Sequence, residues 1–289
     1  MSTVMQRFVE NMVNRIRALR KNRGMPPPAV LTSKKLDSSD SSRPASDHDS
    51  QEDPRYDACV VLADRNIPYC IFCEDALAYH GVPTAVFDLY LLVHDVHLAG
   101  SELLAAGYSK QTEPSELVRV PEFSERYVLD SESIAASDEE TQNLPQTGIV
   151  LLSASDWHYD LAESVEAMTE WFAPLAKALD SMMSRWADLT SVRLRGRLAI
   201  LISYCYLYVE DVKTKDYAKN LDKENRQLHF DEVAETCTAD LGTAKCQEHY
   251  RMVRDQIRRG EHDPTGPSGV ELFPRRPAKW PVKMPIAGA

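Results

Sequence analysis

Hydrophobic and polar positions between residues 67 and 108 follow a pattern that predicts strand, helix, strand and helix in turn. These elements are expected at residues 69–72, 76–80, 86–93 and 96–106. Asp75 is expected to cap the first helix, Gly81 to end it, and Asp95 to cap the second helix. The order of the elements indicates an α/β core.

The rest of the chain predicts a less regular part and then a helical one. Further strands are expected at 117–120, 127–130 and 148–152. Helices are expected at 165–189, 192–212 and 240–259, where apolar residues recur at helical spacing. The predicted fold class is therefore α/β, with a small mixed β-sheet and flanking helices followed by an α-helical C-terminal region.

The composition divides the chain into five parts. They are a basic amphipathic helix at 1–23, a disordered linker at 24–55, an α/β core at 56–155, a helical region at 156–259 and a Pro/Gly-rich tail at 260–289. The linker is rich in Pro, Ser and Asp and has few large apolar residues. It cannot bury enough surface to offset the entropy of ordering, which is why we expect disorder there.

The first 23 residues combine an apolar helical face with six basic residues and a single acid, Glu10. The apolar positions are Met5, Phe8, Val9, Met12, Val13, Ile16 and Leu19. A mitochondrial presequence is Arg-rich, amphipathic and poor in acids in the same way. The alternative is a terminal helix that docks on the body of the protein or on a protein partner. The sequence leaves both open.

The net charge of the 289-residue chain is −11, which argues against bulk nucleic-acid binding because that relies on Lys and Arg at phosphates. Hydrophobic residues make up 43% of the chain, enough to build a core. The apolar run at 198–209 is too short to span a bilayer, and no secretory leader is visible. We therefore expect a cytoplasmic or nuclear protein with no membrane partner, or a mitochondrial one if the N-terminal segment is a presequence.

Most of the six cysteines lie in apolar runs, which is typical of reduced, buried thiols. Cys70 and Cys73 form a C-x-x-C pair that could be a redox pair or half of a zinc site. Their odd separation at a strand end places them on opposite faces, and there is no second C-x-x-C. Cys237, Cys246 and His249 have no zinc-finger spacing. Buried free thiols are the favoured interpretation.

The run ALAYHGVP at 76–83, followed by DLYLLV at 88–93, resembles the core of the nucleotidyltransferase superfamily. In that family a Gly-Gly or Gly-Ser pair ends the first strand and lets backbone amides approach a nucleoside triphosphate. An Asp-x-Asp sequence on the next strand places two carboxylates on one face, where they hold Mg²⁺. The resemblance therefore implies a nucleotide and magnesium if the chemistry is retained.

The chain departs from the family at the positions this chemistry needs. Cys73 and Glu74 stand where the small residues are expected, and Glu74 adds a charge that opposes a triphosphate. Asp88 matches the first acid of Asp-x-Asp, but Tyr90 replaces the second. The resemblance implies a catalytic and metal-binding role for Asp88 and pocket positions for Cys73, Glu74 and Tyr90. Asp130 is a candidate third carboxylate by position alone.

Further residues are similar to an uncharacterised filamentous-fungal subgroup of the superfamily with a degenerate active-site motif. They are the run EDALA at 74–78 with its Gly-Val-Pro turn, Asp156-Trp157, and RQLH at 226–229. No activity follows from that similarity. Elsewhere, Arg193, Arg195 and Arg197 alternate at the start of a predicted helix. Such charges usually pair with acidic surface, although they could contact a nucleotide or RNA.

Three functions are consistent with these observations. The favoured one is a catalytically degenerate nucleotidyltransferase-like protein that acts as a nucleotide-sensing or protein-interaction module. The first alternative is an active, divergent nucleotidyltransferase that uses Asp88, a second acid and magnesium. The second alternative is a non-catalytic adaptor that binds a partner through its N-terminal helix.

Overall fold

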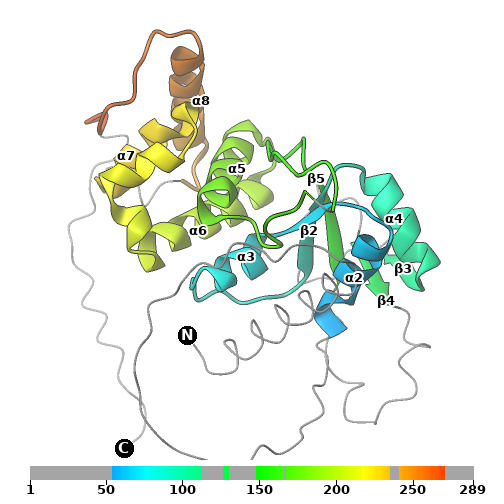
Figure 1. The fold of residues 1–289 in the computed structure, drawn as a ribbon. Coiled ribbons are helices and arrows are strands. Elements are labelled where there is room, and N and C mark those ends of the chain that lie inside the picture. Colours follow the sequence, from blue (N-terminus) through cyan, green and yellow to red (C-terminus); the bar gives the residue numbers. More distant parts are fainter. Residues whose placement is uncertain (1–53, 112–125, 130–147, 166, 235–240, 271–289) are drawn as a thin grey trace, which may run out of the picture.

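The computed structural model describes residues 54–111, 126–129, 148–165, 167–234 and 241–270 (Figure 1). Several predictions fall outside these ranges, namely the helix at 1–23, the linker from 24 to 53, the strand at 117–120, Asp130, Cys237 and the tail from 271. Within the described ranges, no helix is both long and apolar enough to cross a membrane.

A mixed five-stranded sheet forms the centre of the α/β part. Its strands are β1 (Tyr69–Phe72), β2 (Leu89–Val93), β3 (Tyr108–Gln111), β4 (Arg126–Leu129) and β5 (Ile149–Ser153), in the spatial order β1-β2-β5-β4-β3. Strands β2 and β5 pair in parallel, and the other neighbours are antiparallel. Every residue of β1 and β2 is buried, as expected for strands covered on both faces.

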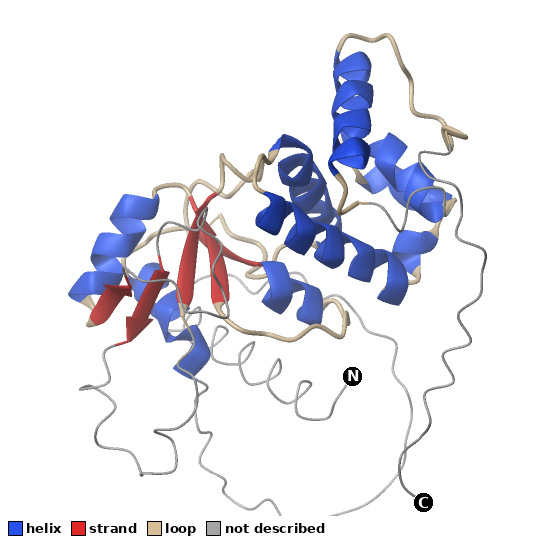
Figure 2. Cartoon of the chain, turned by 180° about the vertical axis from the view of Figure 1, so that it is seen from behind, coloured by secondary structure: helices blue, strands red, loops and turns tan. Residues whose placement is uncertain are grey.

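Helices cover the sheet on both sides. They are the 3₁₀ turn η1 (Pro54–Tyr56) and the helices α2 (Asp57–Asp64), α3 (Cys73–Tyr79) and α4 (Val96–Ala105). Asp95 precedes helix α4 and its side chain accepts from the amides of His97 and Leu98, so the predicted cap is confirmed. Helix α3 packs against β1 and β2 and also touches the helical region. Seen from behind, the strands lie between α4 and that region (Figure 2).

The C-terminal part is helical. It contains α5 (Leu175–Asp188), α6 (Val192–Tyr208), η5 (Asp211–Lys213), η6 (Lys215–Asn220), η7 (Lys223–Asn225), α7 (Arg226–Val233) and α8 (Ala244–Arg258). Helix α5 packs against both α6 and α8. The rings of Phe72 and Trp157 meet at 5.2 Å, and one hydrophobic core runs from the sheet to Leu179 and Leu198. The two parts therefore share a core, and the predicted fold class is confirmed.

The structure differs from the predicted elements in several places. The helix expected at 165–189 begins only at Leu175, because the residues before it lie along the edge of β1. There the amide of Ile71 donates to the carbonyl of Trp171 (2.7 Å), and the amide of Ala173 donates to the carbonyl of Ile71 (2.9 Å). Strand β3 and helix α7 were not predicted. The described residues begin at Pro54, and Pro54 and Arg55, which the composition assigned to the linker, form a 3₁₀ turn with Tyr56.

Candidate functional site

The turn from β1 into α3 has an uncommon backbone conformation at Cys73. Cys73 has a positive φ of 52°, a conformation that glycine adopts readily and that costs a side-chain-bearing residue energy. Cys73 is therefore at a glycine-like position, although its thiol is buried. Helix α3 begins at Cys73, three residues earlier than expected, so Asp75 lies inside its first turn and does not cap it.

Glu74 extends from this turn into an ion pair with Arg197 of α6, in which the carboxylate is buried and the guanidinium is partly exposed. The same guanidinium lies 4.7 Å from the centroid of the Tyr90 ring, at cation–π distance. Burial raises the pKa of the Glu74 carboxyl, and the positive charge of Arg197 partly offsets that rise. Of the three alternating arginines, Arg197 is thus the one that reaches the predicted site, and its partner there is an acidic side chain.

Asp88 lies just before β2, beside the loop that leads into β5. Its Oδ1 accepts a hydrogen bond from the backbone amide of Gly148 (3.0 Å). Tyr90 follows two residues later and pairs across the sheet with Phe72, next to the Cys73–Glu74 turn. Burial raises the pKa of the Tyr90 phenol, and the charges of Glu74 and Asp88 raise it further. The structure thus brings together the four positions that the motif predicted.

Arg55, at the start of the described chain, supports the same site, although no sequence pattern indicated it. Its guanidinium forms a two-pronged ion pair with the carboxylate of Asp75, at 2.8 and 2.7 Å. It also donates to the carbonyls of Phe87 and Asp88, at 2.8 and 3.0 Å. A lone arginine at the end of a polar stretch has no recognisable pattern, which is why sequence reasoning placed Arg55 in the linker.

These residues do not fit a magnesium–triphosphate complex. Cys73, Glu74, Asp88 and Tyr90 are each less than 5% exposed, so they present no open surface to a nucleotide. The described residues contain no group of three His, Cys, Asp or Glu side chains placed to hold a metal. Both acids of the α3 turn already have arginine partners, Arg197 for Glu74 and Arg55 for Asp75.

The cysteines are free thiols within the core. Cys59, Cys70, Cys73, Cys205 and Cys246 are all buried and unbridged, as predicted. Burial raises the pKa of Cys70 and of Cys205 to about 12, which keeps both as neutral thiols near pH 7. The Sγ of Cys70 lies 3.4 Å from the hydroxyl of Tyr159. This environment favours structural thiols over a redox or zinc site.

The other residues quoted for the subgroup resemblance have structural partners. Trp157 is buried against Phe72. His229 in α7 is fully buried, with Nδ1 2.9 Å from the hydroxyl of Tyr206 and Nε2 3.0 Å from the carbonyl of Thr214. Burial lowers the pKa of His229, so its imidazole is neutral near pH 7. These contacts indicate a packing role.

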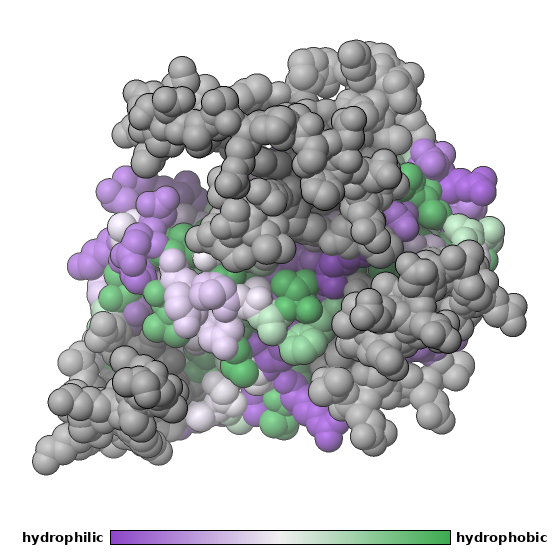
Figure 3. All heavy atoms as spheres, turned by 90° about the horizontal axis from the view of Figure 1, so that it is seen from below, coloured by the Kyte–Doolittle hydropathy of each residue, from purple (hydrophilic) through white to green (hydrophobic). Residues whose placement is uncertain are grey.

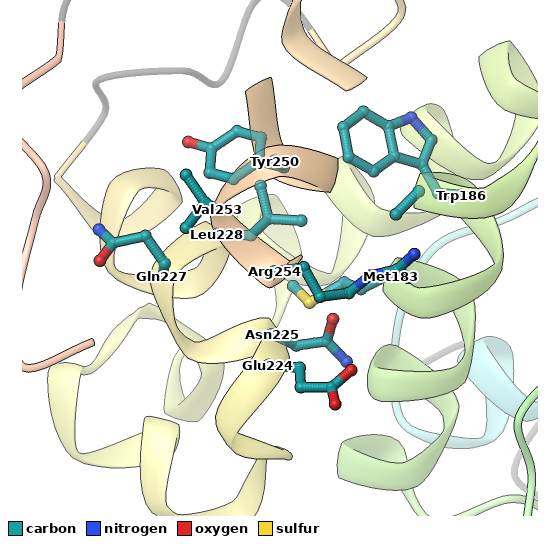
Figure 4. A pocket seen from close by; sticks show the side chains of 10 residues that line it. Met183, Trp186, Glu224, Asn225, Gln227, Leu228, Tyr250, Val253 and Arg254 are labelled. Carbon is teal, nitrogen blue, oxygen red and sulfur yellow. The ribbon is translucent and has the colours of Figure 1, made fainter. Parts of the chain in front are cut away.

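A small pocket lies in the helical region, between α5, α7 and α8 (Figure 4). Met183, Leu228, Tyr250 and Arg254 are among the side chains that line it. The enclosed space is about 10 Å³, roughly what one water molecule needs. It cannot accept a nucleotide, and it is separate from Asp88.

Comparison with known proteins leaves the identification at the level of fold class. Two solved structures are similar to this chain: a proposed nucleotidyltransferase from H. pylori, at 12% identity, and the protein JHP933 from Helicobacter pylori, at 13% identity. The alignments cover 72% of this chain and 94% and 90% of theirs, each with a TM-score of 0.33. A likeness at that score carries no argument by itself.

No protein-family profile and no curated protein matches the chain. The resemblance to the fungal subgroup therefore rests on the motif residues alone. What the structure establishes is an α/β protein with a mixed sheet and a helical C-terminal region, in which Arg197 contacts Glu74 and Tyr90 of the motif.

Proposed function

We propose that this chain is a catalytically degenerate nucleotidyltransferase-like protein that acts as a protein-interaction module. The observation that carries the proposal is the position of Arg197, whose guanidinium lies between the Glu74 carboxylate and the Tyr90 ring. A triphosphate at this turn would have to pull Arg197 away from Glu74. That would leave a buried carboxylate unpaired, which typically costs several kcal/mol.

The loss of carboxylates supports the same conclusion. Magnesium-dependent transfer uses several acidic ligands, and this chain keeps Asp88 but has Tyr90 at the second position. Asp75 is a further acid near Asp88, since Arg55 contacts both residues. The carboxylate of Asp75 is committed to Arg55 and Tyr56, with the Tyr56 hydroxyl at 2.9 Å. The active alternative would therefore need an acid other than Asp75 as the second ligand.

The test is a calorimetric titration of Mg-ATP into the full-length protein, combined with an assay for transfer of labelled nucleotide. We expect neither binding heat nor transfer. Transfer that Asp88→Asn abolishes would overturn the proposal in favour of an active enzyme. Binding without turnover would overturn the interaction module in favour of nucleotide sensing.

A second variant tests the resemblance itself. Glu74→Ser together with Tyr90→Asp restores the family pattern by removing one charge near the phosphates and adding one magnesium ligand. We expect Mg-ATP binding to become measurable in this variant, with thermal melting as the check on folding. A folded double variant that gains no affinity would show that the turn holds no nucleotide in this chain.

A further inference from the structure

Apolar side chains reach the surface of the described part in several places (Figure 3). The longest row lies along α6, where Ile200, Leu207 and Tyr208 are 54%, 57% and 50% exposed. Tyr204 lies between them in the helical spacing i, i+4, i+7, i+8, and its ring meets that of Tyr208 at 5.7 Å. We call these four residues the α6 stripe.

The α6 stripe is unusual because the opposite face of the helix is already buried. Leu194, Leu198, Ile202 and Cys205 face the core with at most 1% exposure. A helix that is apolar on nearly all sides is normally covered on all sides. Polar residues at the four positions of the α6 stripe would leave the buried face of the helix unchanged, so packing of the core does not explain why these positions are apolar. The α6 stripe therefore indicates that another segment covers it.

We propose that residues 5–19, at the N-terminus of the same chain, dock on the α6 stripe. The segment has its own apolar face, from Met5 to Leu19, which needs an apolar surface to bury it. Its three arginines, Arg7, Arg15 and Arg17, also match the acidic side chains just past the end of α6, where Glu210 and Asp211 are both exposed and Glu210 already pairs with one cation, Lys213. The N-terminal segment therefore complements this surface in apolar character and in charge.

The start of the described chain lies close enough to α6 for this contact. Arg55 is held by Asp75, whose neighbour Glu74 is paired with Arg197 on α6. The 30 residues from 24 to 53 have a typical end-to-end distance of about 30 Å if they behave as a flexible chain. Helix α6, with 17 residues, is about 25 Å long. A tether of this length gives a local concentration in the millimolar range.

The proposal is tested by site-specific photo-cross-linking in the full chain. p-Benzoylphenylalanine replaces Phe8, and the cross-linked peptides are mapped by mass spectrometry. We expect cross-links to the peptide that contains residues 200–208. Cross-links that fall only elsewhere on the body, or none at all, would overturn the proposal.

Isotope labelling distinguishes cross-links within one chain from cross-links between two copies of it. Heavy and light protein are mixed before illumination, and we expect cross-links that join only heavy to heavy or light to light. Mixed cross-links would overturn docking within one chain and assign the α6 stripe to contact between copies.

Substitutions then test the α6 stripe directly. Leu207→Lys combined with Ile200→Lys should lower the cross-link yield at least fivefold, because it removes apolar area and adds like charge. Leu104→Lys on α4 is the matched control, since Leu104 is 47% exposed on another helix, and it should leave the yield unchanged. If the double variant fails to melt cooperatively, Leu207→Ser gives the same comparison with a milder change. Equal yields in all variants would sink the proposal.

Discussion

Arg197 lies at the centre of the site, and the energy of its ion pair can be measured. Removing one partner of a buried pair leaves an uncompensated charge, so Arg197→Gln should lower the free energy of unfolding by roughly 3–5 kcal/mol. Glu74→Gln combined with Arg197→Gln should recover much of that loss, because neither residue is then charged. Chemical denaturation of the wild type, both single variants and the double variant gives the coupling energy.

The exposed pair of Arg65 and Glu102, with nitrogen and oxygen 3.1 Å apart, is the matched control. Solvent screens that pair, so Arg65→Gln should cost less than about 1 kcal/mol. Equal losses for Arg197→Gln and Arg65→Gln would mean that the Arg197 pair is solvated in solution, and the proposal that this pair keeps a triphosphate from the turn would fail with it.

Gly81 is the second residue whose role can be tested by itself. It follows α3 with φ +88°, so the predicted C-terminal glycine is confirmed. Gly81→Val should cost on the order of 1 kcal/mol or more through backbone strain, since valine rarely adopts that conformation. Gly196→Ala in α6 is the control, because Gly196 has no positive φ and open space at its Cβ. Thermal melts should show a loss for the first and none for the second.

At the scale of elements, α8 caps the end of α5 through one amide side chain. The Nε2 of Gln247 donates to the carbonyls of Trp186 and Leu189, at 2.6 and 2.7 Å, and its Oε1 accepts from Arg195. These carbonyls belong to a helix end, where backbone acceptors lack partners within the helix. The amide therefore fastens two helices together.

Gln247→Leu should lower the free energy of unfolding by about 1–3 kcal/mol, because it leaves buried carbonyls without a donor. Gln256→Leu, at an exposed position of the same helix, should change it by no more than about 0.5 kcal/mol. Urea titrations of the two variants make the comparison. A neutral Gln247→Leu would show that water replaces the amide at these carbonyls.

The elements that could be predicted from the sequence are those whose determining residues lie within or next to the element. Strand β1 follows a short apolar run, and α4 begins at its own capping residue, Asp95. The missed α7 buries polar side chains such as Asp231, whose hydrogen bonds come from Ser268 and Tyr250 far along the chain. Such a helix lacks the apolar periodicity from which a helix is predicted.

The residues of the site also differ in whether their determinants are close together in the sequence. Glu74, Asp88 and Tyr90 lie within one contiguous motif, so their gathering could be predicted. Arg197 lies 123 residues from Glu74 in the chain, and its alternation with Arg193 and Arg195 indicated no specific partner. Only the packing of α6 against α3 decides which arginine reaches the turn.

At the scale of the whole molecule, the buried cysteines report on global unfolding. Five thiols are buried in the core, and burial raises the pKa of Cys70 to about 12. Native protein should therefore react with a maleimide at these five positions only as fast as it unfolds. Mass spectrometry after timed labelling, with and without denaturant, checks this. Rapid labelling of Cys70 in native buffer would show that its surroundings open locally.

The strand formed by residues 69–72 has its outer backbone groups occupied by Trp171–Ala173, a segment from the helical half. A fragment that ends after β5 would lose residues 171–173 and expose the backbone amides and carbonyls along the edge of β1. Exposed edge strands pair with strands of other chains, so the fragment is expected to self-associate and precipitate. Expression of the α/β half alone is therefore a poor route to studying it, and both halves should be produced as one polypeptide.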